Sequence, residues 1–166
     1  MELFHGKGIQ KTSLFSRNMI FLHLIIGIIL GKLTNNYLPF ILGSIIPDID
    51  HIYTILKHKL YNKKFLDTLK NEEKYKIRYK TPLVHSILGL IIFTILFYLV
   101  TNNYLSAIYF SLAYLLHLLI DWPDKDIKHY LYPSKIKFSG FLPIWSKQER
   151  IITIVCIFIL LIVLIY

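Results

Sequence analysis

Apolar residues gather in five long runs along the chain, and most charged residues lie between or before them. Each run is close to the roughly 17 to 25 residues that an α-helix needs to cross a bilayer. The pattern therefore predicts an all-α fold, a polytopic membrane helical bundle with about five transmembrane helices. The runs cover approximately residues 19–34, 36–56, 83–101, 104–121 and 150–166.

The short connections between runs predict which helices pair. Turn-forming residues at 35–36 separate the first two runs, and residues 101–103 separate the third and fourth. We expect a tight helical hairpin at each place. Pro47 falls inside the second run, and its missing N–H and its ring disrupt the helical hydrogen bonds. The second helix should therefore kink or end near Pro47.

Composition agrees with a membrane protein. The chain has 166 residues, of which 55% are hydrophobic, and its mean hydropathy is +0.52. These values exceed those of an average soluble domain, and the length suits one domain. We therefore expect a single membrane-embedded domain over residues 1–166, with the lipid bilayer as its main partner.

The chain has a net charge of +9, and the positions of its basic residues indicate the membrane topology. Basic residues precede the first run, fill the connection at 57–80 and recur at 125–150. An even number of predicted spans separates these segments, so all lie on one side, which the positive-inside rule makes cytoplasmic. No recognition motif accompanies the charge, so we expect no nucleic-acid partner. The predicted location is the inner (plasma) membrane, with several passes.

Ionisable side chains interrupt the apolar runs near their cytoplasmic ends. At the centre of a membrane helix, each charged side chain costs roughly 2.5 to 3.5 kcal/mol on insertion scales, so such residues mark candidate functional sites. Four predicted helices contribute them at a similar depth. We therefore expect one polar layer that opens toward the cytoplasm. Its members are His23, Asp48, Asp50, His51, His85, His117 and Asp121.

The residue types in this layer suit a divalent metal. His117 and Asp121 are four residues apart on one helical face, so both can reach one cation, or the carboxylate can orient the imidazole. Imidazole and carboxylate without thiolate suit zinc, manganese or iron, and the number of candidates leaves room for a two-metal site. We expect a divalent metal cofactor, with zinc as the first choice.

Structural explanations remain open for each group alone. A histidine in a membrane helix can hydrogen-bond between helices, and His117 with Asp121 can form a structural pair. Residues 48–51 can cap a helix at the membrane surface. His129 is a marginal further ligand, and Asp124 and Asp126 are expected in a solvated loop. If the protein had only a structural role and no functional site, all of these explanations would have to be true at the same time.

The motifs, taken in order, resemble the YdjM-like membrane-bound metal-dependent hydrolases of bacteria and archaea. They are His23, the block at residues 43–51, His85-Ser86, and His117 with Asp121. The order is also similar to the zinc-dependent phospholipase C and nuclease group. That resemblance implies an all-helical fold with His23, Asp50, His85, His117 and Asp121 as core metal ligands. The chain departs from these patterns in two places. It lacks the second His-x-x-x-Glu pair of the phospholipase C and nuclease group, and it has Thr81 where the YdjM-like family usually has arginine.

The expected function is a membrane-bound metal-dependent hydrolase. Its substrate would be a small molecule or lipid with a phosphoester or related bond, at the cytoplasmic face. Asp48 or His51 would be a further ligand or the general base, and Arg78 and Lys80 would bind substrate phosphate. The alternative is a non-enzymatic protein that binds or conducts a cation or proton. Conduction favours polar residues spread through the membrane and repeat symmetry.

Overall fold

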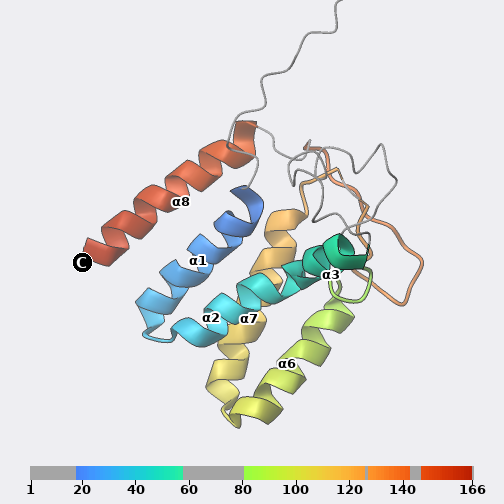
Figure 1. The fold of residues 1–166 in the computed structure, drawn as a ribbon, viewed down its shortest axis with the longest axis horizontal. Helices are drawn as coiled ribbons and strands as arrows, with labels where there is room; N and C mark the ends of the chain where they lie inside the picture. The colour runs from blue at the N-terminus through green and yellow to red at the C-terminus, as the bar shows by residue number, and fades with distance from the viewer. Residues whose placement is uncertain (1–17, 58–80, 126, 143–146, 166) are drawn as a thin grey trace, which may run out of the picture.

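The chain folds as a set of packed helices in a computed structural model that describes residues 18–57, 81–125, 127–142 and 147–165 (Figure 1). Within these ranges the regular structure is helical, and only isolated β-bridges occur. The predicted all-α class is therefore confirmed. The helices are α1 (Asn18–Thr34), α2 (Tyr37–Ile45), the 3-10 helix η1 (Ile46–Asp48), α3 (Ile49–Lys57), α6 (Ile87–Thr101), α7 (Tyr104–Asp121) and α8 (Lys147–Ile165).

Two antiparallel hairpins form the body of the bundle. Helix α2 packs between α1 and α7, α6 packs on α7, and α8 packs on α1 (Figure 1). The turn residues Asn35 and Asn102 have positive φ angles of 54° and 48°, the left-handed conformation that asparagine tolerates better than most residues. Both turns lie toward the lower end of the bundle in Figure 1, so the predicted hairpins are confirmed.

The core is centred on α7, where Phe110, Tyr114 and Leu118 are almost completely buried. Glycines let the neighbouring helices approach closely. A Cβ atom at Gly43 on α2 would overlap the backbone carbonyl of Phe110 on α7, and one at Gly27 on α1 would lie 2.5 Å from Ser44 Oγ on α2. These close approaches bring α1, α2 and α7 together; α1 carries His23, and α7 carries His117 and Asp121.

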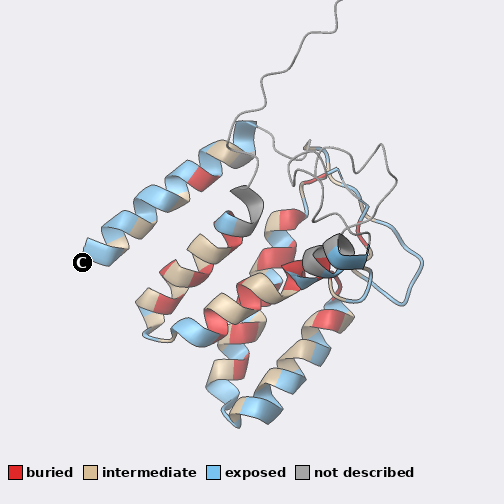
Figure 2. Ribbon diagram, in the orientation of Figure 1, coloured by how far each residue is buried: buried red, intermediate tan, exposed pale blue. Residues whose placement is uncertain are grey.

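Helices α6, α7 and α8 have many exposed residues (Figure 2), and a large number of these are apolar. Large apolar patches on a protein surface indicate contact with lipid or another partner. One described helix, Tyr104–Asp121, is long and apolar enough by itself to cross a membrane, and shorter apolar helices cover Phe21–Thr34, Tyr37–Asp48, Ile87–Thr101 and Arg150–Ile165. Exposed side chains on these surfaces include Ile95, Leu99, Leu112, Leu119, Phe158 and Ile162.

Two helix boundaries are set by local chemistry. As Pro47 predicts, α2 ends at Ile45 and the chain passes through η1 into α3. Helix α6, which corresponds to the third apolar run, begins at Ile87, whereas that run starts at residue 83. Ser86 caps this helix, because its Oγ accepts a hydrogen bond from the Gly89 N–H at 3.1 Å. His85 therefore lies in the turn before α6 rather than within a helix.

The segment after α7 folds back on the bundle. Lys128 and Phe138 exchange two backbone hydrogen bonds of 2.9 Å, and the Tyr130 hydroxyl donates to the Leu118 carbonyl on α7. Asp124 is only 4% exposed, so the expectation that it lies in a solvated loop is wrong. Asp124 is buried because the backbone of this segment pairs with itself, and the polar composition of the segment does not predict that pairing. Asp126 lies outside the described residues.

Candidate metal centre

Asp121, the last residue of α7, faces three histidines from three different segments. Its Oδ1 lies 3.2 Å from Nε2 of His23 on α1. Its Oδ2 lies 3.6 Å from Nε2 of His85 and 3.6 Å from Nε2 of His117. All four side chains are at most 2% exposed. The structure thus places one carboxylate among three imidazoles inside the protein.

His117 is oriented by the backbone of α2. Its Nδ1 lies 2.8 Å from the Ser44 carbonyl oxygen, which can only accept a hydrogen bond, so Nδ1 carries the proton. When the ring is neutral, it presents the lone pair of Nε2 toward Asp121 and toward Asp48, whose Oδ1 is 3.7 Å away. A metal-binding histidine commonly donates its other N–H to a carbonyl or carboxylate in this way.

His85 is oriented in the same way by Asp50, the second residue of α3. The His85 Nδ1 donates to Asp50 Oδ2 at 3.0 Å, and the Thr81 backbone N–H donates to the same oxygen at 2.6 Å. The Tyr114 hydroxyl donates to the carbonyl of Val84, the residue next to His85. The turn before α6 is therefore tied to both α3 and α7, and it directs His85 Nε2 toward Asp121.

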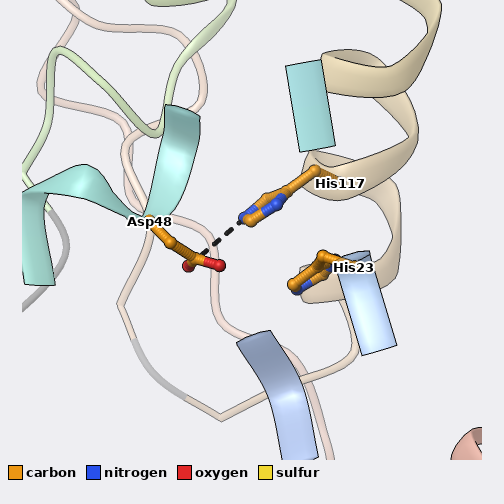
Figure 3. Close-up of side chains that lie close together, drawn as sticks. All are labelled: His23, Asp48 and His117. Atoms are coloured by element: carbon orange, nitrogen blue, oxygen red, sulfur yellow. Dashed lines mark ion pairs between the residues drawn. The ribbon is translucent and has the colours of Figure 1, made fainter. Parts of the chain in front are cut away.

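Asp48, the last residue of η1, lies on the side of the cluster opposite the rings of His23 and His117 (Figure 3). The carboxylate of Asp48 faces the rings of His23 and His117, which lie one over the other. The ring centroids of His23 and His117 are 3.7 Å apart, with an angle of 22° between the ring planes. Pro47 is the second residue of η1, where the α-helical pattern of α2 gives way to a 3-10 turn, and Asp48 is the last residue of η1.

The arrangement fits a divalent cation. When both rings are neutral, the lone pairs of His85 Nε2 and His117 Nε2 face Asp121 Oδ2 at 3.6 Å, and these acceptors repel one another unless a cation lies among them. A charged hydrogen bond would be shorter, about 2.7 to 2.9 Å. Ligands about 2.1 Å from a tetrahedral zinc ion are about 3.4 Å apart, close to the observed separations.

Two further observations support this fit. His23 Nδ1 and His117 Nε2 are buried and make no hydrogen bond. Two overlapping groups of potential ligand atoms lie within 4.8 Å of one another: His23, Asp48 and His117, and His85, His117 and Asp121. The donor set of imidazoles and carboxylates suits zinc, manganese or iron.

Most of the predicted site residues are brought together. His23, Asp48, His85, His117 and Asp121 occur in the three-ligand groups. Asp50 is close but hydrogen-bonds the outer nitrogen of His85, a position that the sequence does not reveal.

The side chain of His51, and Arg78 and Lys80 entirely, lie outside the described residues. His129 is in neither group. The Ser44 carbonyl and the Thr81 N–H were missed, because backbone groups leave no signal in a sequence.

In a comparison with protein-family models, the chain matches the YdjM inner membrane protein family over residues 19–166. That match includes every residue of the cluster. The chain belongs to the YdjM inner membrane protein family. The resemblance inferred from the motifs is therefore confirmed. Neither a curated protein nor a solved structure matches the chain. Membership in YdjM supports a location in the inner membrane, and the buried histidines and aspartates give this YdjM protein a group that could hold a metal.

Replacing Asp50 with asparagine should weaken metal binding without removing a ligand from either three-ligand group. The neutral amide interacts less strongly with His85 Nδ1–H, so the imidazole loses basicity and orientation. Changes of this outer kind typically reduce metal affinity about 10- to 100-fold. Competition with a calibrated zinc chelator would measure the change. An unchanged affinity would show that Asp50 does not position His85.

Proposed function

We propose that this YdjM protein is a polytopic inner membrane protein and a metal-dependent hydrolase whose site faces the cytoplasm. The substrate would be a small molecule or lipid with a phosphoester or related bond. The observation that carries the proposal is the convergence of His23, His85 and His117 on the single carboxylate of Asp121. Such a group is costly to bury in an apolar bundle unless a ligand compensates for it.

The membrane part of the proposal rests on the apolar helices and on the charges between them. Helices α1, α2, α6, α7 and α8 expose apolar side chains along their length. The hairpin turns at 35–36 and 102–103 contain no charged residue, whereas the other connections are rich in lysine. This distribution favours a cytoplasmic position for the ends of the helices that carry the cluster.

The chemical part assigns roles to groups of this chain. When bound, a divalent cation lowers the pKa of a coordinated water and polarises the bond to be cleaved. Asp48, with a side chain 8% exposed, is the most accessible carboxylate of the candidate ligand groups and is proposed as a ligand or general base. His51 is proposed for the same roles, and Arg78 and Lys80 for binding substrate phosphate.

The distribution of ionisable residues favours an enzyme over a cation or proton pathway. From Ile87 to Leu116, which covers α6 and most of α7, the chain contains no Asp, Glu, His, Lys or Arg. The same is true of residues 24–31 and 37–47. A pathway across the membrane would need polar groups at successive depths. A cluster confined to one end suits a reaction at the surface.

Hydrolysis assays on the purified protein test the proposal. The full chain in detergent or nanodiscs would be supplied with zinc, manganese or iron and assayed on phosphomonoester, phosphodiester and phospholipid substrates. We expect hydrolysis that a chelator abolishes and that the exchange His117→Gln reduces to background. His129→Gln is the matched control, because His129 lies outside both ligand groups, and it should retain activity. Equal activity in His117→Gln and the wild type would refute the assignment.

Cysteine accessibility tests the topology. The native Cys156 would first be replaced by serine, and single cysteines would then be placed at Asn36, Asn103 and Ser134. In intact cells we expect an impermeant maleimide to label positions 36 and 103 and not 134, because the positive-inside rule places the lysine-rich segments inside. Labelling of position 134 from outside would contradict the proposed orientation.

A further inference from the structure

The segment that follows α7, residues 122–142, exposes large apolar side chains on its outer surface. Two backbone hydrogen bonds between Lys128 and Phe138 hold the segment in a defined shape. Phe141 is nevertheless 70% exposed and Ile136 is 54% exposed. Apolar side chains exposed together indicate contact with a membrane or another partner. The large apolar and aromatic residues exposed on the segment are Trp122, Ile127, Leu131, Tyr132, Ile136 and Phe141.

The same outer surface is positively charged. Lys125, Lys135 and Lys137 are exposed, and the residue between the last two is an exposed isoleucine. From residue 127 to residue 142 the chain contains no aspartate and no glutamate. Asp124, which the structure describes, is buried. The exposed charge on the described part of this segment is therefore positive, and it lies among apolar side chains.

Hydrogen bonds fix the segment at one end of the bundle. The segment starts directly after Asp121, the last residue of α7, and the Tyr130 hydroxyl donates to the Leu118 carbonyl on α7. The Tyr130 carbonyl accepts a hydrogen bond of 2.9 Å from the Ile87 N–H at the start of α6. The segment, orange in Figure 1, thus lies at the end of the bundle opposite the two hairpin turns. In the proposed membrane placement, this end meets the cytoplasmic headgroups.

We infer that the outer surface of residues 122–142 binds anionic lipid headgroups of the cytoplasmic leaflet, an inference that rests on the membrane placement proposed above. Aromatic side chains are enriched at the boundary between hydrocarbon and headgroups. Each lysine close to an anionic membrane surface strengthens the attraction by roughly fivefold. Lysine stems also pack along apolar surface while their ammonium groups reach polar surroundings. A nucleic acid would match the lysines, whereas the exposed aliphatic side chains favour a partner that contains hydrocarbon.

Fluorescence quenching by brominated lipids tests this inference. Both native tryptophans, Trp122 and Trp145, would be replaced by phenylalanine, and Ile136→Trp would supply the probe in the full chain. Nanodiscs would contain equal amounts of phosphatidylcholine and phosphatidylglycerol, one of them brominated near the headgroup end of its acyl chains. We expect brominated phosphatidylglycerol to quench position 136 severalfold more strongly than brominated phosphatidylcholine, because the flanking lysines enrich the anionic lipid.

Charge variants test the cause of this preference. Lys135→Gln combined with Lys137→Gln should bring the quenching by the two lipids close to equality. Lys32→Gln is the matched control, because Lys32 lies in the last turn of α1, beside a hairpin turn at the opposite end of the bundle. It should keep the preference. A preference that survived in the double variant would overturn the assignment to anionic headgroups.

A second probe separates this inference from the membrane placement beneath it. Leu119→Trp in the same background reports whether α7 contacts lipid, since Leu119 is 56% exposed near the end of that helix. Quenching at 119 without quenching at 136 would overturn this inference and leave the membrane placement intact. No quenching at either position would overturn both. If Ile136→Trp does not fold, Phe141→Trp takes its place as the probe, with the same expected results.

Discussion

Replacing Asp121 with asparagine should abolish hydrolysis and metal retention together. Asp121 is the carboxylate that all three histidines face, and asparagine keeps its size while removing its charge. The loss should exceed the 10- to 100-fold effect of outer residues, so we expect roughly a thousandfold or greater fall in kcat/KM. Parallel assays of phosphoester hydrolysis and of metal per chain would measure it.

Asp124→Asn provides the matched control. It makes the same chemical change at another buried aspartate, one that lies outside both three-ligand groups. We expect Asp124→Asn to keep its metal and most of its activity. If Asp121→Asn hydrolysed the substrate as fast as Asp124→Asn, Asp121 could not be the central ligand.

Replacing Gly43 with valine should cause the largest loss of stability. A Cβ at this position would overlap the Phe110 carbonyl and lie 2.9 Å from Ala113 Cβ, so α2 and α7 would have to separate. Overpacking of this kind costs about 1 to 3 kcal/mol, and more where backbone must move. For a chain of this size we expect the Tm to fall by about 5 to 10 °C. Thermal unfolding in detergent would measure the change.

The same exchange should also weaken metal binding. Ser44 follows Gly43, and its carbonyl accepts the hydrogen bond from His117 Nδ1. Movement of α2 would therefore disturb a ligand on α7. Leu112→Val is the control, since Leu112 is 52% exposed on the outer surface of α7. A Gly43→Val protein as stable as Leu112→Val would refute the close packing of α2 on α7.

The helices could be predicted from the sequence because their signals are local. Long apolar runs and polar turns at 35–36 and 102–103 define the hairpins, and Pro47 marks the break in the second run. The apolar run predicts too early a start for α6, because the run begins before Ser86. The cap at Ser86 depends on one hydroxyl, which hydropathy does not weigh.

The candidate site was only partly predictable. Depth in the bundle predicts that the histidines and aspartates share a layer, and the structure brings most of them together. The pairing within that layer depends on contacts between distant residues. Asp50 reaches His85 across 35 positions, and His117 reaches the Ser44 carbonyl across 73. Spacing along the chain cannot distinguish a ligand from a residue that orients one.

The segment at 122–142 illustrates the same limit. Its lysines and prolines suggest a solvated connection, yet Asp124 and Lys128 are buried at 4% and 1% exposure. Their burial follows from backbone hydrogen bonds that close the segment on itself and from the Tyr130 hydroxyl, which donates to the Leu118 carbonyl on α7. Such pairing depends on tertiary structure, whereas polar composition alone predicts that these residues are exposed to solvent.

The metal content of the purified wild-type protein tests the central claim most directly. The full chain would be prepared in detergent, dialysed to remove loosely bound ions and analysed for zinc, manganese and iron per chain. The buried cluster predicts at least one equivalent of divalent metal per chain in the wild type, with a marked loss in His117→Gln. Folded wild-type protein that retained none of these metals, even after incubation with each, would contradict the account.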